Sequence, residues 1–303
     1  MVAGPGIGPC RCCGPRTGSH QARGGTLAAT RTAAYFDLDK TVLSTSTTFA
    51  LSMPMRRSGL ISAPTLARSV VVQLPYLLFG ADGEQGTRLM NQIAALCAGI
   101  ERAEVERVVA EAMATAIEPA IYTEALDLIE AHRQAGHDVV IVSASTEETV
   151  LPIARLVGAD RAVASRMEVD AAGRFTGQVE RSLMHGAKVP ALEADAAEHG
   201  IDLSSSWAYS DSVSDLPMLQ AVGHPVVVNP DRDLRRHAAE AGWPVRDFEP
   251  PVRVARHAGA DALEEMREAL PQLWKVGVAA AGLFAVGAVA AWAVTSGPVR
   301  PRR

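Results

Sequence analysis

The sequence predicts an α/β fold with a Rossmann-like parallel sheet, a helical cap inserted after the first strand, and a C-terminal transmembrane helix. Two observations predict the sheet. Short apolar runs rich in β-branched residues alternate with amphipathic stretches of helical periodicity, and several apolar runs end directly in polar residues. In an open sheet of this kind, functional side chains collect outside the carboxyl ends of the strands. The 303 residues suffice for one such domain with an insertion.

The amino-terminal segment, residues 1–31, differs in composition from the rest of the chain. It is rich in glycine, proline and arginine and has no periodic apolar pattern, so we expect a disordered leader. It lacks the apolar core of a secretory signal, and a start codon assigned too far upstream would produce the same composition. Because the chain carries a net charge of −5 although this segment is basic, the remainder is acidic, which argues against a nucleic-acid partner.

The first predicted strand, residues 32–37, ends in two aspartates followed by a hydroxyl residue in the stretch YFDLDKT. Asp37 would lie at the tip of the strand, and Asp39 would point in the same direction two residues later. One carboxylate that attacks phosphorus and binds a cation, next to a second that transfers a proton, suits phosphoryl transfer. An acidic turn would have the same residues, so the assignment depends on what the other strands supply.

Residues 44–116 show helical rather than strand periodicity. Because this insertion directly follows the first strand, we expect it to form a helical cap that excludes water and selects the substrate. The flanking residues 32–43 and 117–250 would form the catalytic core. Residues 70–80 are apolar enough to touch lipid but too few to span a bilayer, and packing within the cap is the favoured interpretation.

After the cap, strand and helix patterns alternate. Gly136, Gly158 and Gly200 follow predicted helices in the position of carboxy-terminal caps. Two of the strands are separated by a short turn and are expected to form a hairpin or strand pair. The predicted helices are residues 119–135, 147–157, 187–199, 214–221 and 231–241, and the predicted strands are residues 137–142, 162–169, 174–179, 206–210, 225–228 and 244–248.

Residues 251–273 are expected to form a linker or helix, followed by a transmembrane helix over residues 274–296. Twenty residues from 276 to 295 carry no charge, a length that suits one bilayer crossing. Eight of them are alanine, which contributes little to insertion, so a buried soluble helix is the alternative. We expect a single-pass anchor with the catalytic domain in the cytoplasm, although the arginines after the helix oppose the positive-inside tendency.

Carboxylates that follow two different strands predict a metal site. A phosphate dianion repels a carboxylate nucleophile, so a divalent cation must neutralise both, and oxygen ligands suit Mg²⁺. Asp37 and Asp211 would bind this ion, together with the main-chain carbonyl of Asp39.

Further polar residues at strand ends and helix starts predict a phosphate site. Ser143 and the neighbouring backbone N–H of Ala144 would bind phosphoryl oxygens at a helix start, where anions are favoured. Lys188 would bring a fixed positive charge to the transition state. Asp215 would hold Lys188 or a metal-bound water in place.

Four motifs, DLDKT, VSAS, HGAK and SDSVSDLPML, resemble in order and spacing those of the haloacid dehalogenase superfamily. The helical cap after the first motif resembles its phosphoserine-phosphatase-like branch, subfamily IB, and the resemblance extends over residues 33–248. It implies an aspartyl-phosphate intermediate on Asp37, with Asp39 protonating the leaving group and then activating water. The remaining implied roles are loop support by Thr41, phosphate binding by Ser143 and Lys188, and service of the magnesium site by Asp211 and Asp215.

One position departs from phosphoserine phosphatases, in which a glutamate after the first motif grips the amino group of the substrate. The matching residue here is Ser46, which disfavours phosphoserine. We therefore expect a magnesium-dependent phosphomonoester hydrolase that acts on a small phosphomonoester or on a lipid phosphate near a membrane. Two alternatives stay open: a phosphotransferase with the same intermediate, and a membrane-tethered scaffold that binds phosphate without turnover.

Overall fold

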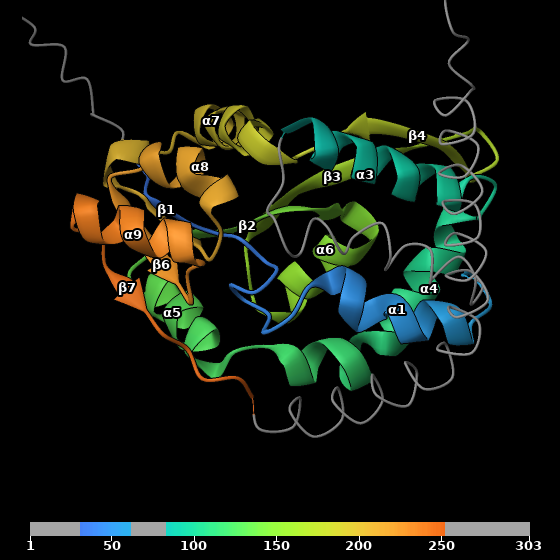
Figure 1. Ribbon diagram of the computed structural model, residues 1–303, viewed down its shortest axis with the longest axis horizontal. Helices are drawn as coiled ribbons and strands as arrows, with labels where there is room; N and C mark the ends of the chain where they lie inside the picture. The colour runs from blue at the N-terminus through green and yellow to red at the C-terminus, as the bar shows by residue number, and fades with distance from the viewer. Residues whose placement is uncertain (1–30, 62–82, 252–303) are drawn as a thin grey trace, which may run out of the picture. The chain divides into compact units, whose positions relative to one another are not determined.

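The computed structural model describes residues 31–61 and 83–251 (Figure 1). The predicted leader up to residue 30, the predicted transmembrane helix over residues 274–296 and all but the first residue of the predicted linker lie outside them. Within the described residues, no helix is long and apolar enough to cross a membrane.

A seven-stranded sheet forms the centre of the described chain, in the order β4-β3-β2-β1-β5-β6-β7. Neighbouring strands are parallel except β3 and β4, which are antiparallel. The predicted parallel α/β sheet is therefore confirmed, with the predicted strand pair at its edge. The strands are β1 (Ala33–Phe36), β2 (Asp138–Thr146), β3 (Arg161–Val169), β4 (Phe175–Arg181), β5 (Trp207–Ser210), β6 (His224–Val228) and β7 (Val245–Arg246).

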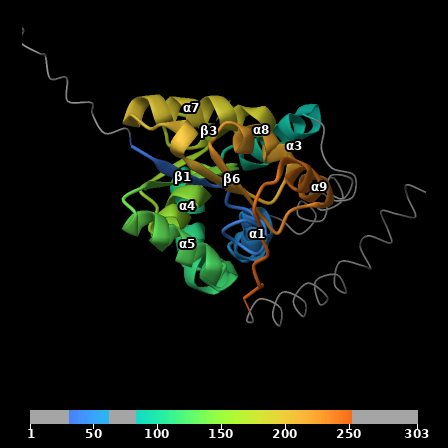
Figure 2. The ribbon, with the colours of Figure 1, turned by 90° about the vertical axis from the view of Figure 1, so that its left-hand side faces the viewer.

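Hydrophobic clusters cover both faces of the sheet. Consecutive strand residues point to opposite faces, and accordingly Tyr35 belongs to one cluster and Phe36 to the other. Burial on both faces explains why the central strands are continuous apolar runs. The helices that pack on the sheet are α5 (Thr123–Gln134), α6 (Glu147–Leu156), α7 (Lys188–His199), α8 (Leu216–Gln220) and α9 (Arg232–Ala241). Figure 2 shows α7 and α8 on the side of the sheet opposite α5.

The segment predicted to be a cap is helical over most of its described length. It contains α1 (Thr47–Arg57), α3 (Gly83–Cys97), α4 (Arg102–Ala112) and a π-helical turn (Met113–Ile117). Helix α1 packs against α4, and α3 packs against β4. The two connections to the sheet pair with each other: the Ser44 N–H donates to the Ala120 carbonyl (2.8 Å) and the Tyr122 N–H to the Val42 carbonyl (3.0 Å). The cap boundaries at residues 44 and 116 stay a prediction.

Two element boundaries differ by four residues from the predicted ones. Strand β2 continues beyond residue 142 because it stays paired with β3 through an irregularity between Ser143 and Thr146. Helix α5 begins at Thr123 rather than at residue 119 because Glu118–Ala120 forms a 3-10 turn.

Candidate active site

The loop after β1 carries the two aspartates that dominate the sequence pattern. The Asp37 N–H donates to the carbonyl of Tyr209 in β5 (2.9 Å), which holds Asp37 at the carboxyl end of the sheet. Lys40 then adopts a left-handed backbone conformation (φ 60°), and the Leu43 N–H donates back to the Leu38 carbonyl (3.0 Å). The chain therefore reverses direction immediately after the aspartates.

Thr41 lies between two carboxylates inside this turn. Its hydroxyl is 3.3 Å from Asp37 Oδ2 and 3.4 Å from Asp211 Oδ1, and all three side chains are buried. Asp211 directly follows β5, which is the neighbour of β1. Because the carboxyl ends of parallel strands share one edge of the sheet, Asp37 and Asp211 come together there.

Lys188 connects this pair to a third carboxylate. It is the first residue of α7, and its Nζ donates to Asp37 Oδ1 (2.6 Å) and to Asp215 Oδ2 (2.7 Å). Asp215 also accepts a hydrogen bond from the Ser210 hydroxyl (2.7 Å), a contact that sequence reasoning missed. We call Asp37, Lys188, Asp211 and Asp215 the acidic cluster.

The acidic cluster contains three carboxyl groups and only one ammonium group. Burial raises the pKa of Asp37 well above its usual value; Lys188 opposes this rise, and Asp215 adds to it. Burial also raises the pKa of Asp211 to about 7. Burial alone would lower the pKa of Lys188, but Asp215 and Asp37 outweigh this effect and raise it. Lys188 therefore stays an ammonium ion beside three carboxyl groups, and burial disfavours the ionised form of Asp37 and Asp211.

Asp39 contacts the start of α1. The Thr47 N–H donates to Asp39 Oδ1 (2.9 Å), and the Thr47 hydroxyl is 3.4 Å from Asp39 Oδ2. The Ser145 hydroxyl near the end of β2 is 3.4 Å from the same Oδ2 and 2.7 Å from the Thr47 hydroxyl. Burial raises the pKa of Asp39, and the hydrogen bonds from Thr47 oppose the rise. Sequence reasoning missed Thr47 and Ser145, whose only signal was the density of hydroxyl residues in LSTSTT and VSAS.

Ser143 and Ala144 lie in the last part of β2. Ser143 is buried, and its hydroxyl accepts a hydrogen bond from the Ser145 N–H (3.1 Å). The Ala144 carbonyl accepts from the Ser165 hydroxyl in β3 (2.7 Å). Ser145 joins this strand end to Asp39, because it donates to Ser143, follows Ala144 in the chain and contacts the loop after β1.

A family model described as haloacid dehalogenase-like hydrolase matches residues 34–220. The chain belongs to this family. It is 46% identical over 251 residues to the inhibition of morphological differentiation protein of Streptomyces azureus, which covers 83% of this chain and 90% of that protein. It is 42% identical over 275 residues to a probable phosphatase of Mycobacterium tuberculosis, covering 91% of each. It is 33% identical over 221 residues to the histidinol-phosphatase of Neisseria meningitidis, covering 71% of this chain and 98% of that enzyme.

Solved structures of other proteins share the fold. A Bordetella pertussis protein of unknown function has a TM-score of 0.64 and 31% identity and covers 72% of this chain and 99% of its own. A phospho-aspartyl intermediate analogue of phosphoserine phosphatase has a TM-score of 0.54 and 19% identity, covering 75% and 99%. The second likeness shows the fold alone. The predicted family and the predicted enzyme class, a phosphatase, are confirmed by the family match and by relatives with that name.

Haloacid dehalogenase-like phosphatases generally use magnesium, and the donors at this site fit that ion. Within the described ranges, no three His, Cys, Asp or Glu side chains converge as a preformed metal centre would require. Mg²⁺ usually takes only one or two carboxylates and completes its shell with waters and substrate phosphate. Asp37 and Asp211, which flank the Thr41 hydroxyl, are such a pair. Burial raises the pKa of both carboxyl groups, and a bound cation would favour their ionised form.

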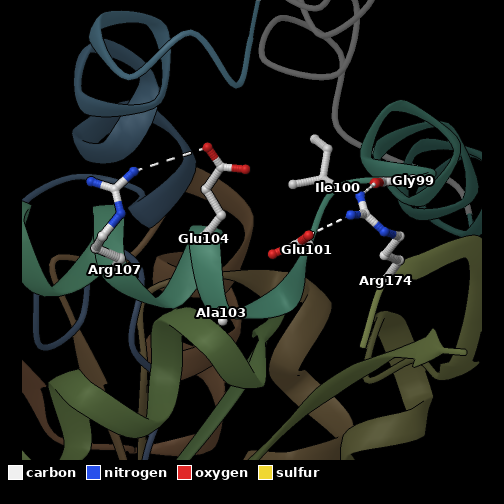
Figure 3. Close-up of a pocket in the computed structure, with 7 residues that line it drawn as sticks. All are labelled: Gly99, Ile100, Glu101, Ala103, Glu104, Arg107 and Arg174. Atoms are coloured by element: carbon white, nitrogen blue, oxygen red, sulfur yellow. Dashed lines mark hydrogen bonds and ion pairs between the residues drawn. The ribbon is translucent and has the colours of Figure 1, made fainter. Parts of the chain in front are cut away.

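A separate cavity of about 660 Å³ lies between the α3–α4 turn and the β3–β4 strand pair (Figure 3). None of the predicted site residues lines it. Its charged groups are paired: Arg174 is directed toward the Glu101 carboxylate and the Gly99 carbonyl, and Arg107 lies 3.9 Å from Glu104. Because these charges satisfy one another, the cavity is not the candidate active site.

Proposed function

We propose that this phosphatase is a magnesium-dependent phosphomonoester hydrolase that works through an aspartyl-phosphate on Asp37. The observation that carries the proposal is the buried Lys188 ammonium bonded to both Asp37 and Asp215. Lys188 is positioned to bind the phosphate oxygens of a substrate approaching Asp37. The membership in the haloacid dehalogenase-like family supports the same chemistry.

In the first step, a carboxylate oxygen of Asp37 forms a bond to phosphorus, and the bond from phosphorus to the leaving-group oxygen breaks. Asp39 donates its proton to that oxygen. In the second step, Asp39 takes a proton from water, the water oxygen attacks phosphorus, and Asp37 is released with inorganic phosphate. Throughout, Lys188 balances the negative charge on the transferring group.

The remaining residues would bind and orient. Ser143 with its hydroxyl and Ala144 with its N–H would hold phosphoryl oxygens. Thr41 would keep Asp37 and Asp211 at their present separation, because its hydroxyl contacts both carboxylates.

Asp37, Asp211 and the Asp39 main-chain carbonyl would hold the magnesium ion, with Asp215 supporting the site. When bound, the ion neutralises the phosphate and the attacking carboxylate.

We further propose that the substrate is membrane-proximal, because a predicted span over residues 274–296 would anchor the chain by a single pass with the catalytic domain in the cytoplasm. Ser46 caps α1 by accepting from the Phe49 N–H (3.2 Å). Because serine is neutral, it offers no negative charge to a substrate ammonium group. A small soluble phosphomonoester remains within the proposal, and a lipid phosphate is the form that the anchor favours. Recovery of the full chain in the soluble fraction, or turnover of lipid phosphates in vesicles no better than that of soluble esters, would exclude the membrane part.

The decisive experiment is a phosphate-release screen of the full chain against soluble and lipid phosphomonoesters, with Mg²⁺ or with EDTA. Asp37→Asn is the control, because it removes the nucleophile and keeps the shape of the side chain. We expect release that requires Mg²⁺ and is lost in the variant. Release that persists in Asp37→Asn would disprove the aspartyl-phosphate mechanism.

A further inference from the structure

We infer that Thr47 and Ser145 are positioning residues that hold the Asp39 carboxyl group for proton transfer to the leaving-group oxygen. The inference rests on the proposed function and deepens it. It is carried by the meeting of three residues from separate elements: Asp39 in the loop after β1, Thr47 at the start of α1, and Ser145 near the end of β2.

Both oxygens of the Asp39 carboxyl group are engaged. Thr47 is the first residue of α1, where backbone N–H groups have no partner inside the helix. Its N–H instead donates to Asp39 Oδ1 at 2.9 Å, while the two hydroxyls each lie 3.4 Å from Oδ2. Two points of attachment restrict rotation of the carboxyl group about its Cβ–Cγ bond.

The pattern of donors also distinguishes the two oxygens. Oδ1 faces a backbone N–H, which can only donate, whereas Oδ2 faces hydroxyls, which can also accept, so this arrangement favours Oδ2 as the protonated oxygen of the neutral acid. Oδ2 faces two hydroxyls, which can accept as well as donate and lie at long distance. Thr47 and Ser145 can therefore support the neutral acid as well as the carboxylate.

The two hydroxyls also act on each other. They are 2.7 Å apart, so one donates to the other, and Thr47 is almost fully buried at 2% exposure. Since each hydroxyl has a single proton, removal of either one changes the hydrogen bonding of the other. The effects of the two residues should therefore be coupled rather than additive.

Proton transfer from Asp39 accompanies cleavage of the bond between phosphorus and the leaving oxygen, whose electron pair takes the proton while Asp37 forms the new bond. A poor leaving group depends on this proton more than a good one. Misplacement of Asp39 should therefore slow phenyl phosphate more than p-nitrophenyl phosphate, whose phenol is the stronger acid. The ratio kcat/KM is the proper quantity, because it does not include the later reaction with water.

The test compares kcat/KM for these two esters in the full chain with Mg²⁺. We expect Thr47→Val and Ser145→Ala each to reduce the value for phenyl phosphate about tenfold more than that for p-nitrophenyl phosphate. Thr47→Ser, which restores the hydroxyl, should recover most of the loss. Thr48→Val is the matched control, because Thr48 is the exposed neighbour in α1 and should leave both values unchanged.

Equal losses for both esters in Thr47→Val and Ser145→Ala, with an active wild type, would overturn the inference and leave the proposed function standing. Failure of the wild type to release phosphate from either ester, or activity that survives Asp37→Asn, would overturn the proposed function and the inference with it. If Thr47→Val does not fold, Ser145→Ala carries the same comparison, because Ser145 is only half-buried.

Discussion

Two clusters of charged residues lie at opposite ends of the same sheet, and they differ in how their charges balance. The acidic cluster lies at the carboxyl ends of the strands. A second cluster lies at the amino ends, where Asp138 and Arg161 are the first residues of β2 and β3. Helix α7 contributes to both, with Lys188 in the acidic cluster and Asp195 in the second. We call Asp138, Arg161, Asp195 and Arg31 the balanced cluster.

In the balanced cluster every carboxylate has a guanidinium partner. Arg161 binds Asp195 through two nitrogens (2.8 and 3.1 Å) and also pairs with Asp138. Arg31 donates to Asp138 (2.5 Å), and the Tyr35 hydroxyl donates to Asp195 (3.1 Å). Burial of Asp138 would raise its pKa, but the hydrogen bonds from Arg161 and Arg31 outweigh this effect and lower it.

The comparison separates a structural cluster from a functional one. Burial raises the pKa of Asp37 despite the contact with Lys188. The pKa of Asp138 is lowered instead, because two arginines donate hydrogen bonds to it. Charges that satisfy one another connect strands and helices, while a cluster with too few cations is suited to bind a ligand that brings positive charge.

The largest expected effect is on turnover. Asp37→Asn should abolish phosphate release, a loss of about 10³-fold or more for removal of a nucleophile. Because the change also relieves repulsion from Asp211 and Asp215, the apo protein should unfold at the same temperature or higher. Thermal unfolding without metal, measured beside turnover, checks this. A large fall in unfolding temperature would mean that the acidic cluster also holds the fold together.

Removal of a charge from the balanced cluster should lower the stability of the protein, in contrast to Asp37→Asn in the acidic cluster. Arg161→Met leaves Asp195 and Asp138 without their shared cation, so we expect a loss of about 3 kcal/mol in the free energy of unfolding. Urea denaturation at pH 7 measures it, and Arg166→Met, on the more exposed Arg166 of the same strand, serves as the control. An Arg161 variant as stable as the wild type would remove the distinction between the clusters.

Metal binding should stabilise the native state through the acidic cluster and not through the balanced cluster. At Mg²⁺ a hundredfold above its Kd, the native state should gain about 2.7 kcal/mol. Thermal unfolding with and without Mg²⁺ should show this gain in the wild type and in Arg161→Met, measured from its lower baseline. It should be missing in Asp211→Asn. Stabilisation that survives in Asp211→Asn would place the ion elsewhere.

The smallest effect concerns a buried histidine without an acidic hydrogen-bond partner among the described residues. His132 contacts the Tyr209 hydroxyl (2.8 Å) and His137 (2.9 Å), and burial, with His137 adding to it, lowers its pKa from 6.5 to about 4. His132 takes up a proton near pH 6.5 in the unfolded chain but only near pH 4 in the folded chain. The free energy of unfolding therefore falls as the pH falls through this window. Between pH 7 and 5 we expect a loss of about 1–2 kcal/mol.

Urea midpoints at the two pH values test this expectation. The His132→Gln variant cannot titrate, so its midpoint should change less than that of the wild type. Equal changes in the two proteins would assign the acid sensitivity to other groups.

The sequence by itself determined the parallel sheet, the strand pair at its edge and the members of the acidic cluster. Burial on both faces imposes continuous apolar runs on the strands, and polar residues directly after parallel strands must share one edge. Asp37 and Asp211 could therefore be assigned to one place without knowing any contact. Their catalytic and metal-binding roles remain predictions.

Only the tertiary structure decided which side chains surround Asp39 and which charges balance. Thr47 and Ser145 are 98 residues apart, and the Arg161 and Asp195 pair is separated by 34. Hydroxyl and charged residues occur throughout a chain, and nothing local distinguishes the few that meet after folding. Strand order and helix packing bring those pairs together, because they determine which ends of strands and helices lie next to one another.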